Sequence, residues 1–170
     1  MDLLCLCGAA GSGKSALARA LSRDYGYKIV KFADPLKDML RVLGLGDREL
    51  EGDLKELPSR ILCGATPRYA MQRLGTEWGR EMMGSELWVN AWKRRVEGLP
   101  VGSLVVVDDC RFPNELEAAR GLGFAPLRIR REATREVRAH VSESALDGVW
   151  MPEVWNDGTL DSLVELVMAI

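Results

Sequence analysis

The residues best suited to chemistry are eight consecutive positions near the start of the chain, with the sequence GAAGSGKS at 8–15. They match the pattern GxxxxGK[ST], in which glycines allow successive backbone N–H groups to point at one phosphate and a lysine adds a point charge. An apolar run at 3–7 precedes the segment and a helical pattern at 14–25 follows it, so a helix N-terminus adds positive potential. We therefore predict a phosphate-binding loop. The alternative is a glycine-rich turn with a solvated lysine.

Each residue of this loop has an expected role. The Lys14 ammonium would reach the β- and γ-phosphates of a nucleotide, and the Ser15 hydroxyl would be a ligand of Mg²⁺. The backbone groups around them would form the phosphate cradle. The predicted cofactor-binding residues here are Gly8, Gly11, Ser12, Gly13, Lys14, Ser15 and Ala16.

Two adjacent carboxylates, Asp108 and Asp109, follow an apolar run at 104–107. At the end of a parallel strand a carboxylate would face the phosphate loop and hold the water shell of a metal ion. Successive strand residues face opposite sides, so only one of the two is expected to point inward. An ordinary strand-end acid is the alternative.

The composition limits the remaining possibilities. With 170 residues, 47% of them hydrophobic, the chain can bury one substantial core, and we expect one domain. The 23 basic and 25 acidic side chains give no global positive field for a nucleic-acid polymer. No apolar run reaches the roughly 18 residues of a membrane span, so we expect a cytoplasmic protein without membrane partners. The four cysteines lack CxxC spacing, and we interpret them as reduced core thiols: Cys5, Cys7, Cys63 and Cys110.

Strand-like and helix-like patterns alternate along the chain, which predicts an α/β fold of three layers, α/β/α, with a parallel sheet. The expected strands lie at 3–7, 27–32, 104–107, 126–129 and 154–155. The expected helices lie at 14–25, 35–42, 66–84 with an interruption near Gly75, 87–96, 114–122, and from the turn at 156–159 to Ile170. Residues 44–65 look like an irregular insertion.

Arginines are placed as a phosphotransferase would require. Transfer between two anionic substrates needs cations near both phosphates and a closure that excludes water. Arginines that could serve the acceptor are Arg68, Arg73, Arg80 and Arg111, and those that could form a closing lid are Arg128, Arg130, Arg131, Arg135 and Arg138. For any one of them, a solvated surface position is the alternative. The chain has no Asn-Lys-x-Asp tetrad, which counts against a GTPase.

Several segments together resemble the phage-type deoxynucleoside monophosphate kinase family. The most specific are LGTEWGRE at 74–81 and RFPNE at 111–115. Further matching segments are FADPLK at 32–37, GDLKE at 52–56, LWVN at 87–90, HVSE at 140–143 and NDGT at 156–159. The resemblance covers nearly the whole chain, in the order of the family.

The resemblance implies a P-loop kinase that uses Mg-ATP to convert a deoxynucleoside monophosphate to the diphosphate, a step of dNTP biosynthesis in a bacteriophage-infected cell. It implies one domain over 1–170, with a helical acceptor-binding insertion at about 44–98 and a lid at about 130–143. Two positions of the turn before the last helix, Asn156 and Gly158, would contact the donor adenine through main-chain groups.

The resemblance also implies which residues form the site. The catalytic residues would be Lys14, Asp109, Arg111 and Arg131, with Ser15 and Asp109 serving the metal. The acceptor would be bound by Asp34, Lys37, Arg68, Trp88, Asp109, Arg111, Glu115, Arg130 and Arg135. Trp88 would provide a stacking surface, and the single histidine, His140, is expected to be structural.

Two other functions stay open at this point. One is a P-loop kinase of another small acceptor such as dephospho-coenzyme A, in which Asp34 would be the base for a hydroxyl. The other is a regulatory or packaging-associated module that binds ATP without transferring its phosphate. The sequence gives no signal for the oligomeric state, and a homodimer is left open.

Overall fold

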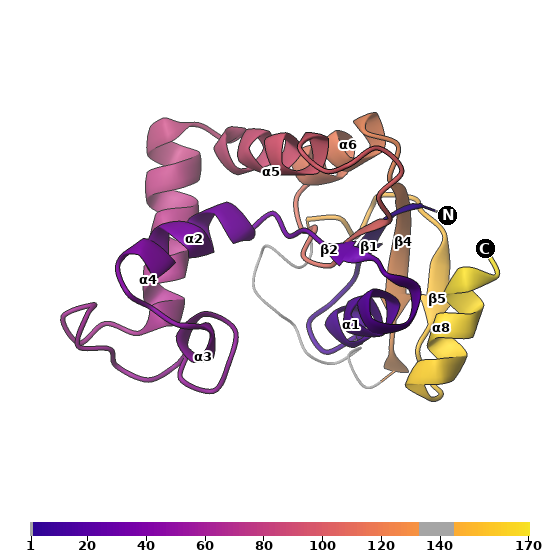
Figure 1. Ribbon diagram of the computed structural model, residues 1–170, viewed down its shortest axis with the longest axis horizontal. Helices are drawn as coiled ribbons and strands as arrows, with labels where there is room; N and C mark the ends of the chain where they lie inside the picture. Colours follow the sequence, from indigo (N-terminus) through magenta and orange to yellow (C-terminus); the bar gives the residue numbers. More distant parts are fainter. Residues whose placement is uncertain (1, 133–144) are drawn as a thin grey trace. The chain divides into compact units, whose positions relative to one another are not determined.

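The computed structural model describes residues 2–132 and 145–170. By its internal contacts the chain divides into two compact units, one formed by residues 1–31 and 95–170 and the other by residues 32–94 (Figure 1). The first unit contains the sheet and the phosphate-binding loop. The second is helical and overlaps most of the insertion predicted at about 44–98.

The first unit is built on a five-stranded sheet in the order β2-β3-β1-β4-β5, in which every neighbouring pair is parallel. The strands are β1 (Leu3–Cys7), β2 (Lys28–Ile29), β3 (Val105–Val107), β4 (Ala125–Arg130) and β5 (Glu153–Trp155). This confirms the predicted parallel α/β sheet. The strand expected at 27–32 is shorter because β2 is an edge strand that pairs only with Val105 and Val106 of β3.

Helices cover both faces of this sheet. The first unit contains α1 (Lys14–Tyr25), α6 (Pro113–Gly121) and α8 (Leu160–Met168). Helix α1 connects β1 to β2 in one direction along the sheet, and α6 connects β3 to β4 in the other. Right-handed crossovers therefore place these two helices on opposite faces. Helix α8 packs beside α1 (Figure 1).

One apolar core lies between the sheet and the α1/α8 layer. Leu4 and Leu6 of β1, Leu127 and Ile129 of β4 and Leu163 of α8 are all buried in it. Since side chains alternate along a strand, Cys5 and Cys7 of β1 face the opposite side of the sheet. The core fixes the central strand from which the phosphate-binding loop emerges.

The second unit is helical. It contains α2 (Asp34–Val42), α3 (Asp47–Leu50), α4 (Pro67–Arg73), the π-helix η1 (Leu74–Met83) and most of α5 (Leu87–Glu97). Its core consists of Leu36, Leu40, Leu45, Leu50, Met71 and Trp88. Thr66 caps α4, because its Oγ1 accepts a hydrogen bond from the Tyr69 N–H at 3.1 Å. The interruption expected near Gly75 is a change from α- to π-helix.

The π-helix η1 packs closely against the side chain of Trp88. Trp88 is buried, and its Nε1–H donates to the Gly75 carbonyl at 2.8 Å. A Cβ added to Gly79 would lie 2.3 Å from Trp88 Nε1 and 2.5 Å from its Cε2, so only glycine fits at that position. The indole of Trp88 therefore lies directly against the backbone of the π-helix.

Replacing Gly79 with alanine should therefore destabilise the protein. Overpacking a buried ring costs about 1–3 kcal/mol, so the free energy of unfolding measured in urea should fall by that amount. Gly75→Ala is the matched control, because its added Cβ would meet nothing closer than Leu36 Cδ2 at 3.5 Å. Equal effects of the two substitutions would contradict this account of the π-helix.

Among the residues that the structure describes, no helix has the length and apolar character needed to cross a membrane.

Candidate active site

The phosphate-binding loop connects the end of β1 to the start of α1. Gly8 and Gly13 have positive φ angles of 128° and 104°. A Cβ at Gly8 would lie 2.3 Å from the Ile129 carbonyl oxygen, and one at Gly13 would lie 2.3 Å from Asn156 Nδ2. Both glycines are thus required by backbone conformation and by close neighbours. The loop is held between β4 and the turn that precedes α8.

Lys14, the first residue of α1, lies against this loop. Its ammonium donates hydrogen bonds to the carbonyl oxygens of Gly8 and Ala9, both at 2.6 Å, and to Ser12 Oγ at 3.3 Å. Ser12 is fully buried, and Ser15 is partly exposed in the first turn of α1. The lysine charge is therefore held at the loop, where the helix N-terminus also points, and this arrangement favours an anionic phosphate.

The turn before α8 supports the loop directly. Asn156 Nδ2 donates to the Ser12 carbonyl at 2.8 Å, which links two segments 144 residues apart in the sequence. The next residue, Asp157, accepts a hydrogen bond from the Glu132 N–H at 3.2 Å. The resemblance predicted a nucleotide contact for this turn, which stays a prediction, and the structure shows that Asn156 supports the loop.

Two carboxylates follow β3 next to the phosphate-binding loop. Because β1 and β3 are parallel and Cys5 pairs with Val107, the carboxyl ends of both strands lie at the same end of the sheet. Asp108 is 4% exposed, and its Oδ1 has no hydrogen-bond partner in the described part of the chain. Lys31 Nζ lies 3.6 Å from that oxygen. Asp109 is half-buried.

The burial of Asp108 and the open hydrogen-bonding capacity of its Oδ1 fit a nearby metal ion with bound waters. A buried ionised carboxylate is costly unless a cation or hydrogen bonds compensate it. Lys31 does so in part, and the carboxylate oxygen keeps its capacity to accept a hydrogen bond from a metal-bound water. The residue types at this edge, Ser15 and the two acids, are oxygen ligands of the kind that Mg²⁺ prefers. The resemblance assigned the metal to Asp109, whereas the more buried of the two acids in the structure is Asp108.

Arg111 and Glu115 lie at the start of α6. The Arg111 side chain is exposed, whereas Glu115 is 3% exposed. Glu115 Oε2 accepts hydrogen bonds from the backbone N–H groups of Arg111 at 2.8 Å and Phe112 at 3.2 Å. Glu115 thus caps the helix and fixes the backbone that carries Arg111. This capping role was missed from the sequence, although a glutamate three residues after a helix start is its usual signal.

Comparison with known proteins identifies the family. No family model matches the chain. A protein of Acanthamoeba polyphaga mimivirus, provisionally named a deoxynucleotide monophosphate kinase, is 30% identical over 162 residues, which cover 88% of this chain and 84% of the relative. The chain belongs to the deoxynucleotide monophosphate kinase family. It is a kinase and hence an ATP-dependent phosphotransferase.

A solved structure supports the fold of this family member. The crystal structure of a protein from Chloroflexus aurantiacus, provisionally described as a kinase, has a TM-score of 0.51 to this chain. Its sequence is 13% identical, and the match covers 99% of this chain and 94% of the other. At that identity the likeness concerns the fold alone.

One arginine predicted for the lid of this kinase is instead part of its core. Arg128 lies in β4 and is 7% exposed. Its guanidinium donates to Glu153 Oε1 at 2.9 Å and to the carbonyls of Leu146 at 2.6 Å and Val149 at 2.9 Å. The prediction for Arg128 was wrong, because the strand continues through it and its charge is neutralised inside the fold.

Two other arginines predicted for the lid lie at the end of β4 and directly after it. Arg130 is the last residue of β4 and donates to both oxygens of Glu153, at 2.8 and 2.7 Å. Together Arg130 and Arg128 lower the pKa of Glu153 to about 2. Arg131 follows the strand and is exposed. Arg135, Arg138 and His140 lie outside the described residues.

Several predicted acceptor residues of the kinase lie in the second unit. Asp34 begins α2, and Lys37 of the same helix is 5% exposed and ion-paired with Glu51. Arg68 is exposed and ion-paired with Glu56. Two further arginines were predicted for the acceptor. Arg73 is ion-paired with Glu77, and Arg80 is half-buried.

Trp88 does not offer the expected stacking surface. It is 4% exposed, and its ring centroid lies 6.0 Å from that of Trp78. With its N–H bonded to Gly75 and its ring against Gly79, it is a core residue of the second unit. The sequence could not show this, since an aromatic residue in a helix serves either role.

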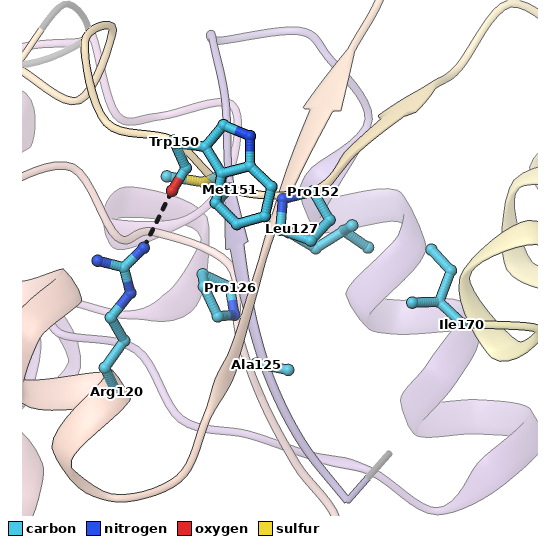
Figure 2. A pocket seen from close by; sticks show the side chains of 8 residues that line it. All are labelled: Arg120, Ala125, Pro126, Leu127, Trp150, Met151, Pro152 and Ile170. Carbon is cyan, nitrogen blue, oxygen red and sulfur yellow. Dashed lines mark hydrogen bonds between the residues drawn. The ribbon is translucent and has the colours of Figure 1, made fainter.

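An apolar pocket lies at the end of the sheet opposite to the phosphate-binding loop. It has a volume of about 270 Å³ and is lined by Arg120, Ala125, Pro126, Leu127, Trp150, Met151, Pro152 and Ile170 (Figure 2). At the side of the pocket, the Arg120 guanidinium donates a hydrogen bond to the Trp150 carbonyl at 3.1 Å. Because Ala125 pairs with Leu4, near the start of β1, the pocket is at the amino ends of the strands and is separate from the candidate active site.

Proposed function

We propose that this kinase transfers the γ-phosphoryl group of ATP to a deoxynucleoside monophosphate, which yields the diphosphate and ADP. The observation that carries the proposal is the complete phosphate-binding loop, with Lys14 held at its carbonyls, in a chain of this family. The name of the mimivirus relative supports the acceptor class. Arg111, just before α6, and Arg131, just after β4, are exposed cations that would supply charge for a second anionic substrate.

The proposed reaction is a direct in-line transfer. A phosphate oxygen of the acceptor forms a bond to the γ-phosphorus, and the bond from that phosphorus to the bridging oxygen of ADP breaks. The acceptor oxygen is already anionic at neutral pH, so no strong base is needed. Catalysis then depends on positioning and on charge compensation, and no covalent intermediate with the protein forms.

The donor side would be held by the loop and α1. The N–H groups of the loop would bind the β-phosphate, and the Lys14 ammonium would exchange the carbonyls of Gly8 and Ala9 for phosphate oxygens. Mg²⁺ bound with ATP would neutralise charge on the β- and γ-phosphates, held by Ser15 and by a carboxylate that follows β3. Asn156 would keep the loop in shape, and Asn156 and Gly158 remain the proposed adenine contacts.

The two acids that follow β3 would divide between the substrates. The burial of Asp108 and the hydrogen-bonding capacity of its Oδ1 support a place at the metal. Asp109, first predicted for the metal, would then act on the acceptor side together with Arg111. Glu115 would position Arg111 through its backbone. Arg130, Arg131 and Arg135 remain proposed cations for the transferred phosphate.

Replacing Arg111 with alanine should weaken use of the acceptor. If its guanidinium binds the acceptor phosphate, the KM for the monophosphate should rise and kcat should fall, together lowering kcat/KM by about 10²-fold. The KM for ATP should change little. Arg23→Ala, which removes the same charge from an exposed position of α1, is the control. An unchanged acceptor dependence would remove Arg111 from the site.

The acceptor class is tested by a panel. Diphosphate formation from Mg-ATP would be measured with each deoxynucleoside and ribonucleoside monophosphate and with dephospho-coenzyme A. The proposal predicts rapid conversion of one or more deoxynucleotides. Phosphorylation of dephospho-coenzyme A alone would assign another acceptor, and ATP hydrolysis indifferent to every acceptor would indicate a regulatory module.

A further inference from the structure

Three buried cysteines meet on the face of the sheet opposite the α1/α8 layer. Cys5 and Cys7 are two residues apart on β1 and so point to the same side. Cys110 lies three residues after Val107, the last residue of the neighbouring strand β3. The exposed fractions are 0%, 0% and 2%, and the three Sγ atoms all lie within 4.8 Å of one another. Thiols from two adjacent strands thus converge on one point.

We propose that Cys5, Cys7 and Cys110 form a three-thiolate site for a soft metal ion of the Cu⁺, Zn²⁺ and Cd²⁺ type. The sequence alone suggested only reduced core thiols, because the CxC pair and the third cysteine are about a hundred residues apart in the chain. The site is independent of the nucleotide chemistry proposed above and does not rest on it.

The geometry fits such an ion. With a metal–sulfur distance of about 2.3 Å, three sulfurs in a trigonal arrangement are about 4.0 Å apart. The observed upper bound of 4.8 Å requires only small side-chain adjustments. Thiolates are soft ligands that select this class of metal over Mg²⁺, so the site would not compete for the ion that accompanies ATP.

The electrostatic surroundings lower the pKa of one thiol of the cluster and raise the pKa of the other two. The pKa of the Cys7 thiol is lowered by hydrogen bonds with Cys110 and then Cys5, and Arg128 and Lys14 contribute as nearby cations. The pKa of Cys110 is raised, chiefly by its hydrogen bonds with Cys5 and then Cys7. A metal binds cysteine as the thiolate and must displace the protons that the thiols hold. Affinity should increase with pH as a result.

The location gives the site a structural consequence. Cys7 directly precedes Gly8 of the phosphate-binding loop, and Cys110 follows the acids Asp108 and Asp109. A metal held by Cys5, Cys7 and Cys110 would join the end of β1 to the segment after β3. Occupancy would therefore restrain both the loop and the carboxylates that are proposed to bind Mg-ATP.

The test is a Cd²⁺ titration of the reduced full-length chain without oxygen, followed by the ultraviolet sulfur-to-cadmium charge-transfer absorption. The proposal predicts a band that saturates at one Cd²⁺ per chain and is stronger at pH 8 than at pH 6. Cys110→Ser should reduce the affinity by at least about 10²-fold. Cys63→Ser is the matched control, because Cys63 is exposed and lies in the second unit.

Two results would overturn the proposal. One is the absence of a saturable charge-transfer band in the unaltered chain. The other is a band that Cys63→Ser abolishes and Cys110→Ser leaves unchanged. If Cys110→Ser does not fold, the ¹¹³Cd resonance of the Cys63→Ser protein decides the question: a position typical of three sulfur ligands supports the site, and a position typical of oxygen ligands rejects it.

Discussion

Replacing Lys14 with alanine should lower kcat by about 10²- to 10³-fold while the protein stays folded. The structure holds the ammonium of this lysine at the carbonyls of Gly8 and Ala9 in the phosphate-binding loop. Its removal takes away a charge that binds the transferred phosphoryl group more strongly in the transition state than in the ground state. The measurement is the steady-state rate of diphosphate formation at saturating ATP and acceptor.

The control for this experiment is Lys28→Ala. Lys28 is exposed on the edge strand β2, and its ammonium donates to Ser103 Oγ at 3.4 Å. Its replacement by alanine changes the net charge by the same amount. Thermal unfolding of both variants would show that the fold persists. Near-normal turnover of a folded Lys14→Ala protein would contradict the assignment of this loop as the catalytic phosphate site.

Replacing Asp108 with asparagine should separate activity from stability. If Asp108 holds the metal's water shell, kcat should fall by about 10²-fold and the Mg²⁺ concentration needed for half-maximal rate should rise. The folded protein should lose little stability, because the substitution removes a buried negative charge whose Oδ1 accepts no hydrogen bond from the described residues. An activity loss with an unchanged or higher melting temperature is typical of a functional rather than a structural acid.

Asp109→Asn is the matched comparison, since it makes the same chemical change one residue away. We expect it to alter the KM for the acceptor more than the dependence on Mg²⁺. The reverse pattern, in which Asp109→Asn shifts the Mg²⁺ dependence and Asp108→Asn does not, would return the metal to the residue that the sequence first suggested.

Much of the sheet unit could be predicted because its signals are local. The apolar run at 3–7, the glycines after it and the periodic pattern at 14–25 define β1, the loop and α1, and the structure places all three where expected. A strand buried on both faces and a helix with one apolar face leave little choice of conformation. The parallel sheet follows from the alternation of such units.

The side chains that were misjudged depend on contacts between distant segments. Arg128 looked like part of an arginine-rich lid, and its burial depends on Glu153 and the carbonyls of Leu146 and Val149, 18 to 25 residues away in the chain. Trp88 looked like a stacking surface, and its burial depends on the π-helix at Gly75 and Gly79. No spacing rule in the sequence reports such partners.

The acids after β3 show an intermediate case. Alternation along a strand predicted that only one of Asp108 and Asp109 would point inward, and in the structure Asp108 is buried and Asp109 is half-buried. The choice between them depends on how the chain leaves the sheet after Val107, which the apolar pattern does not specify. In the same way, Glu115 was predicted for the acceptor and stays a prediction in that role, and its contacts with the backbone of Arg111 and Phe112 emerge only from the start of α6.

The most direct test of the central claim is the fate of the γ-phosphate. ATP labelled at its γ-phosphorus would be incubated with the protein and with the deoxynucleoside monophosphate that the panel finds best, and the labelled products would be separated. We predict that the label appears in the β-phosphate of the deoxynucleoside diphosphate, in equal amount to the ADP formed. Label recovered as inorganic phosphate, at a rate that the monophosphate does not change, would contradict the account.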